Sequence, residues 1–503
     1  MPVQRKSLMN KEHSILCDLS LGHTSQGWSG IAQDTRFLFD GLNASDKLNM
    51  TGHLYGTFQD PFHLDSGNVN ISDEERVAIF LGCYLNGMEI AQEHSFVRRV
   101  ISRLVPFSNR IYHAFDRLSL NRKTDFELFN IPEEFYASIW RQYFSFSIPV
   151  EHQARLLSAN YKYSGLSRAR MQDAVLGRFN QPSLNTNGFD FAIFQYSGYT
   201  RLSNGTIPIA RYHDGMPFFS SDTFRNMNFT LEHSRAIKLS ENVVYVCNSP
   251  NSLDDLALIN EKTASNAHVI PCFLPVMKKP EVRSEILKDI FEVRKSPSTQ
   301  PNKQETGVDI WFNEQKEIPK FIMTLSTIEP RKNIIGLISA WQMLRYKSGE
   351  DIKLLVVGKP GWDFEQTLNA MRPHVKRGDL MHIEGAAQYE LPYLYAAASC
   401  FVFPSTGEGF GLPPNEAMQC DCPVAVSDIA GHRYSCGDAA LYFNPYDLDG
   451  MAMAMETLVN ADKNSGFIQD LIAKGHKNVD RYSHATVLQQ WEDLFDKLKA
   501  ERE

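Results

Sequence analysis

In the second half of the chain, short apolar runs alternate with longer segments whose apolar residues recur every three or four positions. The runs read KFIMTLS, KLLVVG, LMHIEG, CFVFP, CPVAVS and ALYFNP. Between the first two runs, Ile334, Ile338 and Trp341 share one face of a helix. Strands that are apolar throughout are buried on both faces, and strands that alternate with helices form a parallel sheet with right-handed crossovers. Residues 319–482 are therefore predicted to form a Rossmann-like α/β domain.

The first half of the chain is less regular but has similar apolar runs. The strands of a second α/β domain, over residues 1–300, are predicted from SILCDLSLG, FDFAIFQYSG, IPIARYHD, NVVYVCNS and AHVIPCFLP. The stretch RKSPSTQPNKQETG is polar and has no periodicity, so residues 301–318 are predicted to be a linker. Residues 483–503 have an amphipathic pattern, which predicts a C-terminal helix that packs back on the N-terminal domain.

Composition narrows the classes of function. The net charge of −8 gives no case for binding nucleic acid. The eight cysteines have no paired CxxC spacing, so buried reduced thiols are expected rather than disulfides or a zinc site. The apolar stretch near the N-terminus is interrupted by Asp18, and no segment has the ~20 uninterrupted apolar residues of a membrane span. These features predict a cytoplasmic protein.

The stretch STGEGFGLPPNE follows the apolar run CFVFP and precedes a helical pattern. Ligands of doubly wound sheets bind beyond the carboxyl ends of the strands, where this loop is expected to lie. Glycines allow the backbone to approach a ligand, and the free amides of a helix start attract anions. The carboxylates of Glu408 and Glu416 suit sugar hydroxyls. A nucleotide sugar would use all of these groups, although the two glutamates also suit a solvated loop and a helix dipole.

A second loop, TLSTIEPRKN, is predicted to reach the same edge of the sheet. It places Arg331 and Lys332 side by side. A leaving nucleoside diphosphate needs positive charge to stabilise its developing negative charge. A proline followed by two surface cations is the simpler interpretation, but a second phosphate-suited loop at one edge favours a diphosphate site.

The segments STIEPRKN, HIEGAAQYELPYLYAAASCFVFPSTGEGFGLPPNEAM and GDAALYFNPYD resemble the family 4 retaining glycosyltransferases of the GT-B fold. The resemblance implies two Rossmann-like domains that face each other across a cleft. It also implies that Glu408 holds hydroxyls of the donor sugar and that Glu416 binds the ribose. Lys332, together with Arg331, would neutralise the diphosphate without a metal. The other donor contacts would come from Gly385, Ala386, Gly409, Phe410, Gly411 and Leu412.

Two elements of the first half resemble the same family. In SQGWSGIAQDTRFLF, Gly27 and Gly30 correspond to a glycine loop near the acceptor and the donor phosphates. In IARYHDGMP, His213 and Asp214 correspond to an element at a strand end, where the histidine lies beside the transferred sugar. The spacing between these elements is longer than is usual in the family, which predicts an inserted, largely helical region over about residues 58–185.

Two further patterns have a less specific explanation. The pair Asp447 and Asp449 forms a DxD pattern, which holds a metal in other glycosyltransferases, but Asp449 is predicted to be a helix cap. The inserted region carries basic residues among apolar ones, including Arg98, Arg99 and Arg103. These arginines would allow peripheral contact with the inner face of a membrane, or would simply form a solvated face.

Together these features predict a metal-independent glycosyltransferase that transfers a hexose with retention of anomeric configuration. His213 and Glu408 are its candidate catalytic residues. The first donor hypothesis is GDP-mannose, because TIEPRKN resembles mannosyltransferases of bacterial surface polysaccharide and O-antigen synthesis. The acceptor would be a saccharide or a lipid-linked saccharide. The alternatives are an epimerase or hydrolase of nucleotide sugars with the GT-B fold, and a non-catalytic scaffold.

Overall fold

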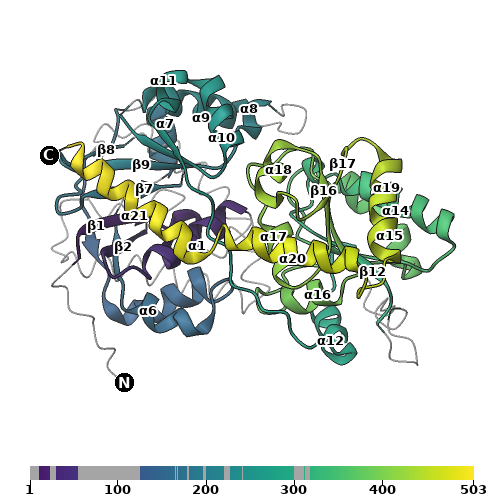
Figure 1. Cartoon of the computed structure of the whole chain (residues 1–503). Helices are drawn as coiled ribbons and strands as arrows, with labels where there is room; N and C mark the ends of the chain where they lie inside the picture. The colour runs from purple at the N-terminus through teal and green to yellow at the C-terminus, as the bar shows by residue number, and fades with distance from the viewer. Residues whose placement is uncertain are drawn as a thin grey trace, which may run out of the picture.

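The computed structural model describes residues 11–22, 30–54, 125–164, 166, 168–177, 180–195, 200–219, 227–240, 242–299, 311 and 318–502. Two α/β domains lie side by side, each built on its own sheet (Figure 1). The predicted α/β class with two Rossmann-like domains is confirmed. Of the predicted features, Gly27, the three arginines Arg98, Arg99 and Arg103, and most of the linker lie outside the described residues.

The C-terminal domain contains a six-stranded parallel sheet in the order β14-β13-β12-β15-β16-β17. Each predicted apolar run forms one strand, because each can be buried on both faces. The strands are β12 (Phe321–Leu325), β13 (Lys353–Val357), β14 (Leu380–Ile383), β15 (Cys400–Phe403), β16 (Val424–Ser427) and β17 (Leu441–Phe443). The strand order reverses at β12 and β15, so the loops that follow these two strands lie next to each other.

Helices cover both faces of this sheet (Figure 1). One hydrophobic cluster includes Trp341 and Met455, and a second includes Tyr395 and Phe401 on the opposite face. The helices are α14 (Ile334–Ser348), α15 (Glu365–Arg377), α16 (Leu391–Ala397), α17 (Leu412–Gln419), α18 (Ala430–Cys436) and α19 (Leu448–Asn460).

The N-terminal cap of α19 differs from the prediction. The side chain of Asp447 accepts a hydrogen bond of 3.1 Å from the amide of Gly450, so Asp447 is the cap. Asp449 lies in the first turn and pairs with Lys347 at 2.9 Å. The prediction of Asp449 as the cap is therefore wrong, because the cap lies two residues earlier, at the other aspartate of the DxD pattern.

The N-terminal domain contains an eight-stranded sheet in the order β11-β10-β9-β7-β1-β2-β5-β4, in which only the pair β4 and β5 is antiparallel. Its five predicted strands are β1 (His13–Asp18), β7 (Phe191–Phe194), β9 (Ile207–Tyr212), β10 (Val244–Cys247) and β11 (Ala267–Val269). Its first helix is α1 (Gly30–Leu42). A small parallel sheet, β3 (Asp125–Phe126), β6 (Ser183–Leu184) and β8 (Arg201–Leu202), lies beside it.

Part of the predicted insertion belongs to the main sheet. Strand β2 (Leu48–Leu54) pairs in parallel with both β1 and β5 (Asn160–Tyr163), and β4 (Phe129–Asn130) completes the edge. The predicted insertion over residues 58–185 is therefore too wide, because its strands β4 and β5 are integral to the sheet. These strands are short and contain polar residues, so no apolar run marks them in the sequence.

The predicted domain boundary also needs correction. Helix α12 (Ser284–Arg294) packs its residues Leu287 and Phe291 into the core of the C-terminal domain, although residues 1–300 are predicted to be N-terminal. The amide of Met277 donates to the side chain of Gln419, so the chain has already reached the second domain by that residue. The physical reason is that the apolar face of α12 has its partners in the C-terminal domain.

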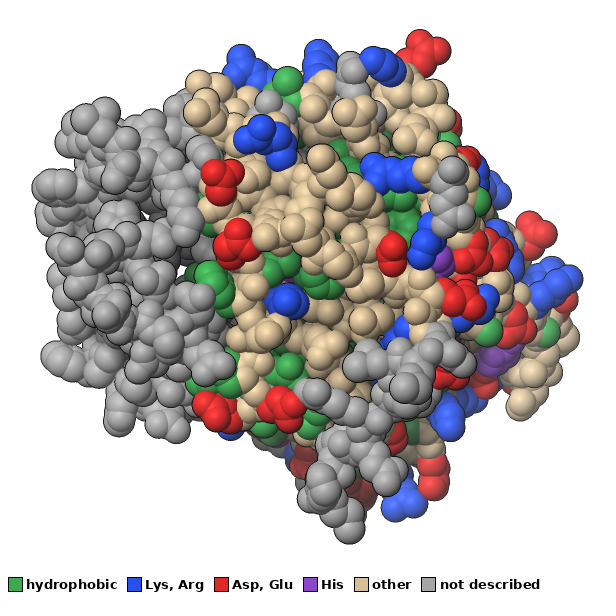
Figure 2. All heavy atoms as spheres, turned by 90° about the vertical axis from the view of Figure 1, so that its left-hand side faces the viewer, with side chains coloured by type: hydrophobic (Ala, Val, Ile, Leu, Met, Phe, Trp, Pro, Cys, Tyr) green, Lys and Arg blue, Asp and Glu red, His purple; other side chains and the backbone are tan. Residues whose placement is uncertain are grey.

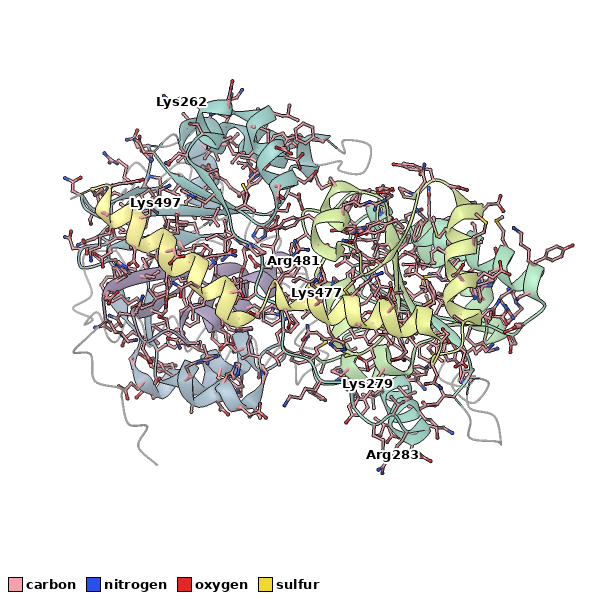
Figure 3. All side chains as sticks on the ribbon, viewed as in Figure 1. Lys262, Lys279, Arg283, Lys477, Arg481 and Lys497 are labelled. Atoms are coloured by element: carbon pink, nitrogen blue, oxygen red, sulfur yellow. The ribbon has the colours of Figure 1, made fainter. Side chains whose placement is uncertain are left out.

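The chain returns to the N-terminal domain through its last two helices. Helix α20 (Gly466–Asp480) packs on the C-terminal domain and α21 (His484–Ala500) on the N-terminal domain (Figure 1). Arg481 lies at the junction between them (Figure 3). Trp491 of α21 is fully buried in the N-terminal core. The two domains are therefore joined by two crossings of the chain.

The surface and the thiols give little further guidance. On the face drawn in Figure 2, acidic and basic side chains are interspersed. The seven cysteines of the described part are buried and free, which confirms their predicted burial. None of the described helices combines the length and the apolar character that a membrane crossing requires.

Trp491→Ala tests the packing of α21. We expect the loss of this buried side chain to lower the free energy of unfolding by about 3–5 kcal/mol. Urea denaturation monitored by circular dichroism measures the shift, with Tyr346→Ala as the control because Tyr346 is 92% exposed. An unchanged midpoint for Trp491→Ala would show that α21 is not part of the N-terminal core.

Candidate active site

A cleft of about 530 Å³ lies between the two domains. Its walls come from the loops after β12, β13, β14 and β15 on one side, and from α1 and the end of β9 on the other. The structure brings most of the predicted site residues together here. The lining includes Gly30, His213, Asp214, Arg331, Lys332, Gly385, Ala386, Glu408, Gly409, Phe410, Gly411 and Leu412.

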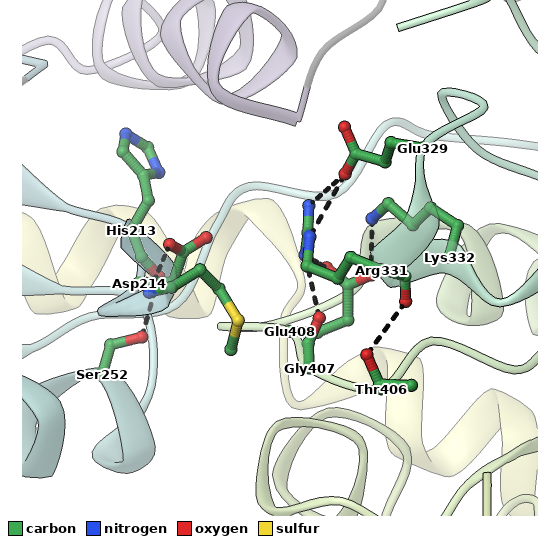
Figure 4. A network of polar contacts seen from close by, with 10 residues as sticks. His213, Asp214, Ser252, Glu329, Arg331, Lys332, Thr406, Gly407 and Glu408 are labelled. Atoms are coloured by element: carbon green, nitrogen blue, oxygen red, sulfur yellow. Dashed lines mark hydrogen bonds and ion pairs between the residues drawn. The ribbon is translucent and has the colours of Figure 1, made fainter. Parts of the chain in front are cut away.

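A cluster of ion pairs forms the wall from the C-terminal domain. Glu408 accepts from Arg331 Nη1 at 2.9 Å and from Lys332 Nζ at 2.5 Å, with one carboxylate oxygen for each cation. Arg331 also donates to one oxygen of Glu329, from Nε at 3.1 Å and from Nη2 at 2.8 Å. Figure 4 shows the Arg331 guanidinium between the two carboxylates. Two cations and two carboxylates thus form a group with balanced formal charge.

Burial makes these ion pairs strong. Burial alone would raise the pKa of Glu408, but the charges of Arg331 and Lys332 outweigh it and hold this pKa well below its usual range. Burial would likewise lower the pKa of Arg331, but the carboxylates of Glu408 and Glu329 raise it above its usual value. Glu408 and Arg331 are therefore both charged at neutral pH. Removing one partner would leave a buried charge uncompensated.

Local backbone structure places both cations. Pro330–Lys332 form one turn of 3-10 helix, and Asn333 follows in the left-handed region with φ of 51° before α14 begins. The carbonyl oxygen of Arg331 accepts from the amide of Thr406 at 2.9 Å, which joins this loop to the loop after β15. The Lys332 ammonium lies 5.3 Å from the centre of the Phe403 ring. The two predicted loops therefore form one unit.

Glycines let the segment around Glu408 pass between the two domains. A Cβ atom on Gly409 would lie 2.0 Å from the carbonyl oxygen of His213, and one on Gly431 would lie 2.2 Å from that of Glu408. The His213 carbonyl also accepts from the Ser252 hydroxyl at 2.8 Å. Any side chain at Gly409 would clash with the His213 backbone, so the close approach of the two domains at this point requires a glycine.

The start of α17 forms another part of the wall. Gly411 precedes the helix with φ of 85°, and no side chain caps the helix N-terminus. Pro413 and Pro414 lie in the first turn, where a missing N–H costs nothing. Uncapped amides and the helix dipole make this end of α17 favourable for an anion. Gly385, with φ of 68°, and Ala386 line the same cleft.

The wall from the N-terminal domain contains His213 and Asp214, which lie on the other side of the cleft from the ion pairs (Figure 4). The carboxylate of Asp214 accepts from the amide of Met216 at 3.1 Å. The imidazole Nδ1 of His213 lies 3.8 Å from the carboxylate of Asp34, which is itself 2.9 Å from Arg211 Nε. Burial lowers the pKa of His213 although Asp34 opposes the shift, so the imidazole is neutral at pH 7.

Sequence reasoning missed Glu329, Asp34 and Arg211. Glu329 lies within TIEPRKN, and its position two residues before Arg331 is the available signal. Asp34 follows the predicted Gly30 by four residues on α1, so it shares that end of the helix. No sequence signal pairs Asp34 with Arg211, because 177 positions separate them.

Glu416 is not among the residues that line the cleft. It lies one turn into α17 and is 1% exposed, with one oxygen accepting from the Tyr395 hydroxyl at 2.8 Å. Burial raises the pKa of Glu416 to about 7. The helix turns this carboxylate toward α16, which explains why it lies apart from Glu408 despite their closeness in the sequence.

Potential metal ligands lie elsewhere. Within the described ranges, one group of His, Asp and Glu side chains is close enough to share an ion, and it consists of Glu12, His13 and Asp496. None of these three lines the cleft. The carboxylates of Asp447 and Asp449 are engaged separately, in a helix cap and a surface ion pair.

The fold and the cleft define a class of protein. The chain has the GT-B fold, since the solved structure of sucrose-phosphate synthase from Thermosynechococcus elongatus aligns with 97% of this chain and 100% of its own, with a TM-score of 0.52 and 14% identity. Residues 308–471 match the glycosyl transferases group 1 family. The second half of the chain therefore contains a glycosyltransferase group 1 domain.

The curated relatives carry the comparison further. The chain is 37% identical over 132 residues to O-antigen chain mannosyltransferase B of Escherichia coli, a match that covers 26% of this chain and 35% of that protein. It is 30% identical over 172 residues to O-antigen chain mannosyltransferase RfbU of Salmonella typhimurium, covering 34% of this chain and 45% of that protein. Each match thus spans less than half of the relative, and the chain resembles mannosyltransferases over that part.

Glu416→Gln tests the buried carboxyl. Its pKa is raised from 4.5 to about 7, so ionisation of the folded protein is unfavourable relative to the unfolded chain. Below about pH 4.5 the carboxyl is protonated in both the folded and the unfolded protein, and its contribution to the free energy of unfolding is at its maximum. This contribution falls as the pH rises to about 7, by about 1.4 kcal/mol for each pH unit. We therefore expect Glu416→Gln to gain stability relative to the wild type between pH 4.5 and 7, and to keep this gain above pH 7.

Urea denaturation of both proteins at pH 5 and pH 8 measures this difference. The control is Glu365→Gln, at an exposed position in the first turn of α15. A stability difference that stays constant between the two pH values would contradict the raised pKa.

Proposed function

We propose that this protein is a retaining glycosyltransferase that transfers a hexose from a nucleotide sugar to a saccharide or lipid-linked saccharide acceptor. The observation that carries the proposal is the pairing of Arg331 and Lys332 with one carboxylate, Glu408, in a cleft that His213 faces from the other domain. The match to the glycosyl transferases group 1 family supports the class of reaction. Mannose from GDP-mannose is the first donor hypothesis, because the relatives are O-antigen mannosyltransferases.

The ion-pair cluster suits a diphosphate. Hydrogen bonds to charged groups contribute about 1.5–3 kcal/mol each, so phosphate oxygens can compete with Glu408 for Arg331 and Lys332. The carboxylate that these cations release can then accept hydrogen bonds from hydroxyls of the sugar. Glu329 keeps its own bonds to Arg331 during this exchange. Binding of the donor would thus replace the ion pairs of Glu408 with ion pairs between the diphosphate and the same two cations.

With the diphosphate at Arg331 and Lys332, the other parts of the donor can be assigned to neighbouring residues of the cleft. The base would lie by Gly385 and Ala386, and the amides of Gly409, Phe410, Gly411 and Leu412 would face the sugar and the diphosphate. The assignment of Glu416 to the ribose requires its carboxylate to leave Tyr395 and turn toward the cleft.

Transfer would proceed on one face of the sugar. The bond from the anomeric carbon to the diphosphate oxygen breaks, and the acceptor hydroxyl forms its bond on the same side, so the configuration is retained. The leaving diphosphate takes the proton of the acceptor. Arg331 and Lys332 stabilise its developing charge, while His213 orients and stabilises the sugar. Closure of the cleft excludes water and suppresses hydrolysis of the donor.

Three substitutions test this assignment. We expect Glu408→Ala, Lys332→Ala and His213→Ala each to lower turnover by about a hundredfold or more, because each removes an electrostatic contact to the reacting groups. Initial rates with GDP-mannose and an oligosaccharide acceptor measure the effect. The matched control is Lys347→Ala, whose ammonium pairs with Asp449 at the surface and should leave the rate unchanged. Near-normal rates in the three variants would refute the site.

Product analysis separates the alternatives. A panel of GDP-, UDP- and dTDP-sugars identifies the donor by thermal shift, since a ligand at 100 times its Kd adds about 2.7 kcal/mol of stability. Sugar transfer only when acceptor is present, with a retained anomeric signal by NMR, supports a transferase. Altered or hydrolysed donor without acceptor would favour an epimerase or hydrolase, and no turnover would favour a scaffold. Because two side-chain cations serve the diphosphate, we expect EDTA to leave the rate unchanged.

A further inference from the structure

Helix α1 carries a buried acid, Asp34, that the proposed mechanism does not use. Asp34 is 1% exposed and lines the cleft. One of its oxygens, Oδ2, accepts from Arg211 Nε at 2.9 Å and lies 3.8 Å from Nδ1 of His213. The carboxylate therefore lies between a permanent cation and the imidazole assigned to the transferred sugar.

Arg211 fixes the position of this carboxylate. Its guanidinium is 1% exposed and also donates to the carbonyl oxygen of Ile270 at 2.6 Å. Trp491 of α21 covers it, with its ring centre 5.9 Å from the guanidinium carbon. Burial would raise the pKa of Asp34, but the charge of Arg211 outweighs burial and lowers this pKa, so the carboxylate is charged. An anchored cation thus holds the carboxylate in one place.

His213 has one ring nitrogen near this carboxylate and one without a partner. Its side chain is 11% exposed, and Nε2 is buried with no hydrogen-bond partner among the described residues. The charged groups that act on the ring are Asp34 from α1, Arg211 from β9 and the neighbouring Asp214. A buried nitrogen without a partner is costly unless a ligand supplies one.

We propose that Asp34 is a positioning residue for His213, whose carboxylate keeps the ring proton on Nδ1 and leaves Nε2 free to accept a hydrogen bond from a hydroxyl of the transferred sugar. The negative charge at Asp34 favours the N–H on the ring edge that faces it. The distance of 3.8 Å exceeds a hydrogen bond, and we expect it to shorten when the donor binds. This inference rests on the proposed function, because it assigns the role of Nε2 toward the sugar.

The same helix provides a matched control. Asp40 is also buried on α1, at 2% exposure, and it pairs with Arg155 at 2.5 Å and with Nδ1 of His152 at 2.8 Å. It therefore resembles Asp34 in its helix, burial and partners. Asp40 does not line the cleft. Any effect of neutralising a buried acid on α1 in general should appear at both positions.

A double-mutant cycle tests whether Asp34 acts through His213. We expect Asp34→Asn to lower kcat by about tenfold to a hundredfold, the range for a misplaced reacting group, with the affinity for GDP unchanged. In the background of His213→Gln, Asp34→Asn should have no further effect. Asp40→Asn should keep the wild-type kcat. An additive loss in the double variant, or an equal loss in Asp40→Asn, would overturn the proposal.

A second measurement needs no variant at Asp34 and no activity. The wild-type protein with 15N-labelled histidine, recorded by NMR at pH 7.5, reports the tautomer of each ring, and the signal that disappears in His213→Gln is that of His213. We expect a neutral ring with the proton on Nδ1. A ring protonated on Nε2, or on both nitrogens, would overturn the inference even if sugar transfer is observed. Absence of transfer from every nucleotide sugar would instead refute the proposed function and leave the tautomer to be judged by NMR.

Discussion

The site depends on one carboxylate, Glu408, that is shared by two buried cations. An isolated buried charge is expensive, and neither Arg331 nor Lys332 would lie in this cleft without an anion to pair with. In the structure that anion is Glu408, and in the proposed reaction it is a diphosphate. The cluster therefore holds two cations at the sheet edge, and a diphosphate could replace Glu408 as their partner. Glu329 pairs with Arg331 at 2.8 Å in the structure, and in the proposed reaction it would keep this cation in place.

Two crossings of the chain bring the opposite wall to this cluster. The first leads into α12 and the second through α20 into α21, so the N-terminal domain includes the last helix of the chain. Between the two walls, the backbone of Gly409 meets the carbonyl of His213 without room for a side chain. Trp491 of α21 also covers Arg211, which holds Asp34 beside His213. The last helix thus supports the wall opposite the ion-pair cluster.

The sequence predicts the C-terminal domain far better than the N-terminal one, for physical reasons. Its strands are buried on both faces, so each appears as an apolar run, and both cation and carboxylate loops follow such runs. Strands β2, β4 and β5 contain polar residues and have no such signal. Helix α12 is amphipathic, but its periodicity does not say which domain its apolar face meets.

The same distinction holds for the candidate site. Residues whose position is set by their own loop, such as Lys332 after β12 and Glu408 after β15, can be recognised from a short motif. Contacts that arise only from tertiary packing, such as Asp34 with Arg211, have no local pattern. Glu416 shows the opposite case, because a motif predicts a role in the cleft while the helix directs its carboxylate to Tyr395.

The most direct test of the account is a crystal structure of the protein soaked with GDP-mannose. The account predicts diphosphate oxygens within hydrogen-bond distance of Arg331 and Lys332, with the sugar between Glu408 and His213. A cleft that stays empty under saturating donor, or a nucleotide bound with its diphosphate away from both cations, would contradict it.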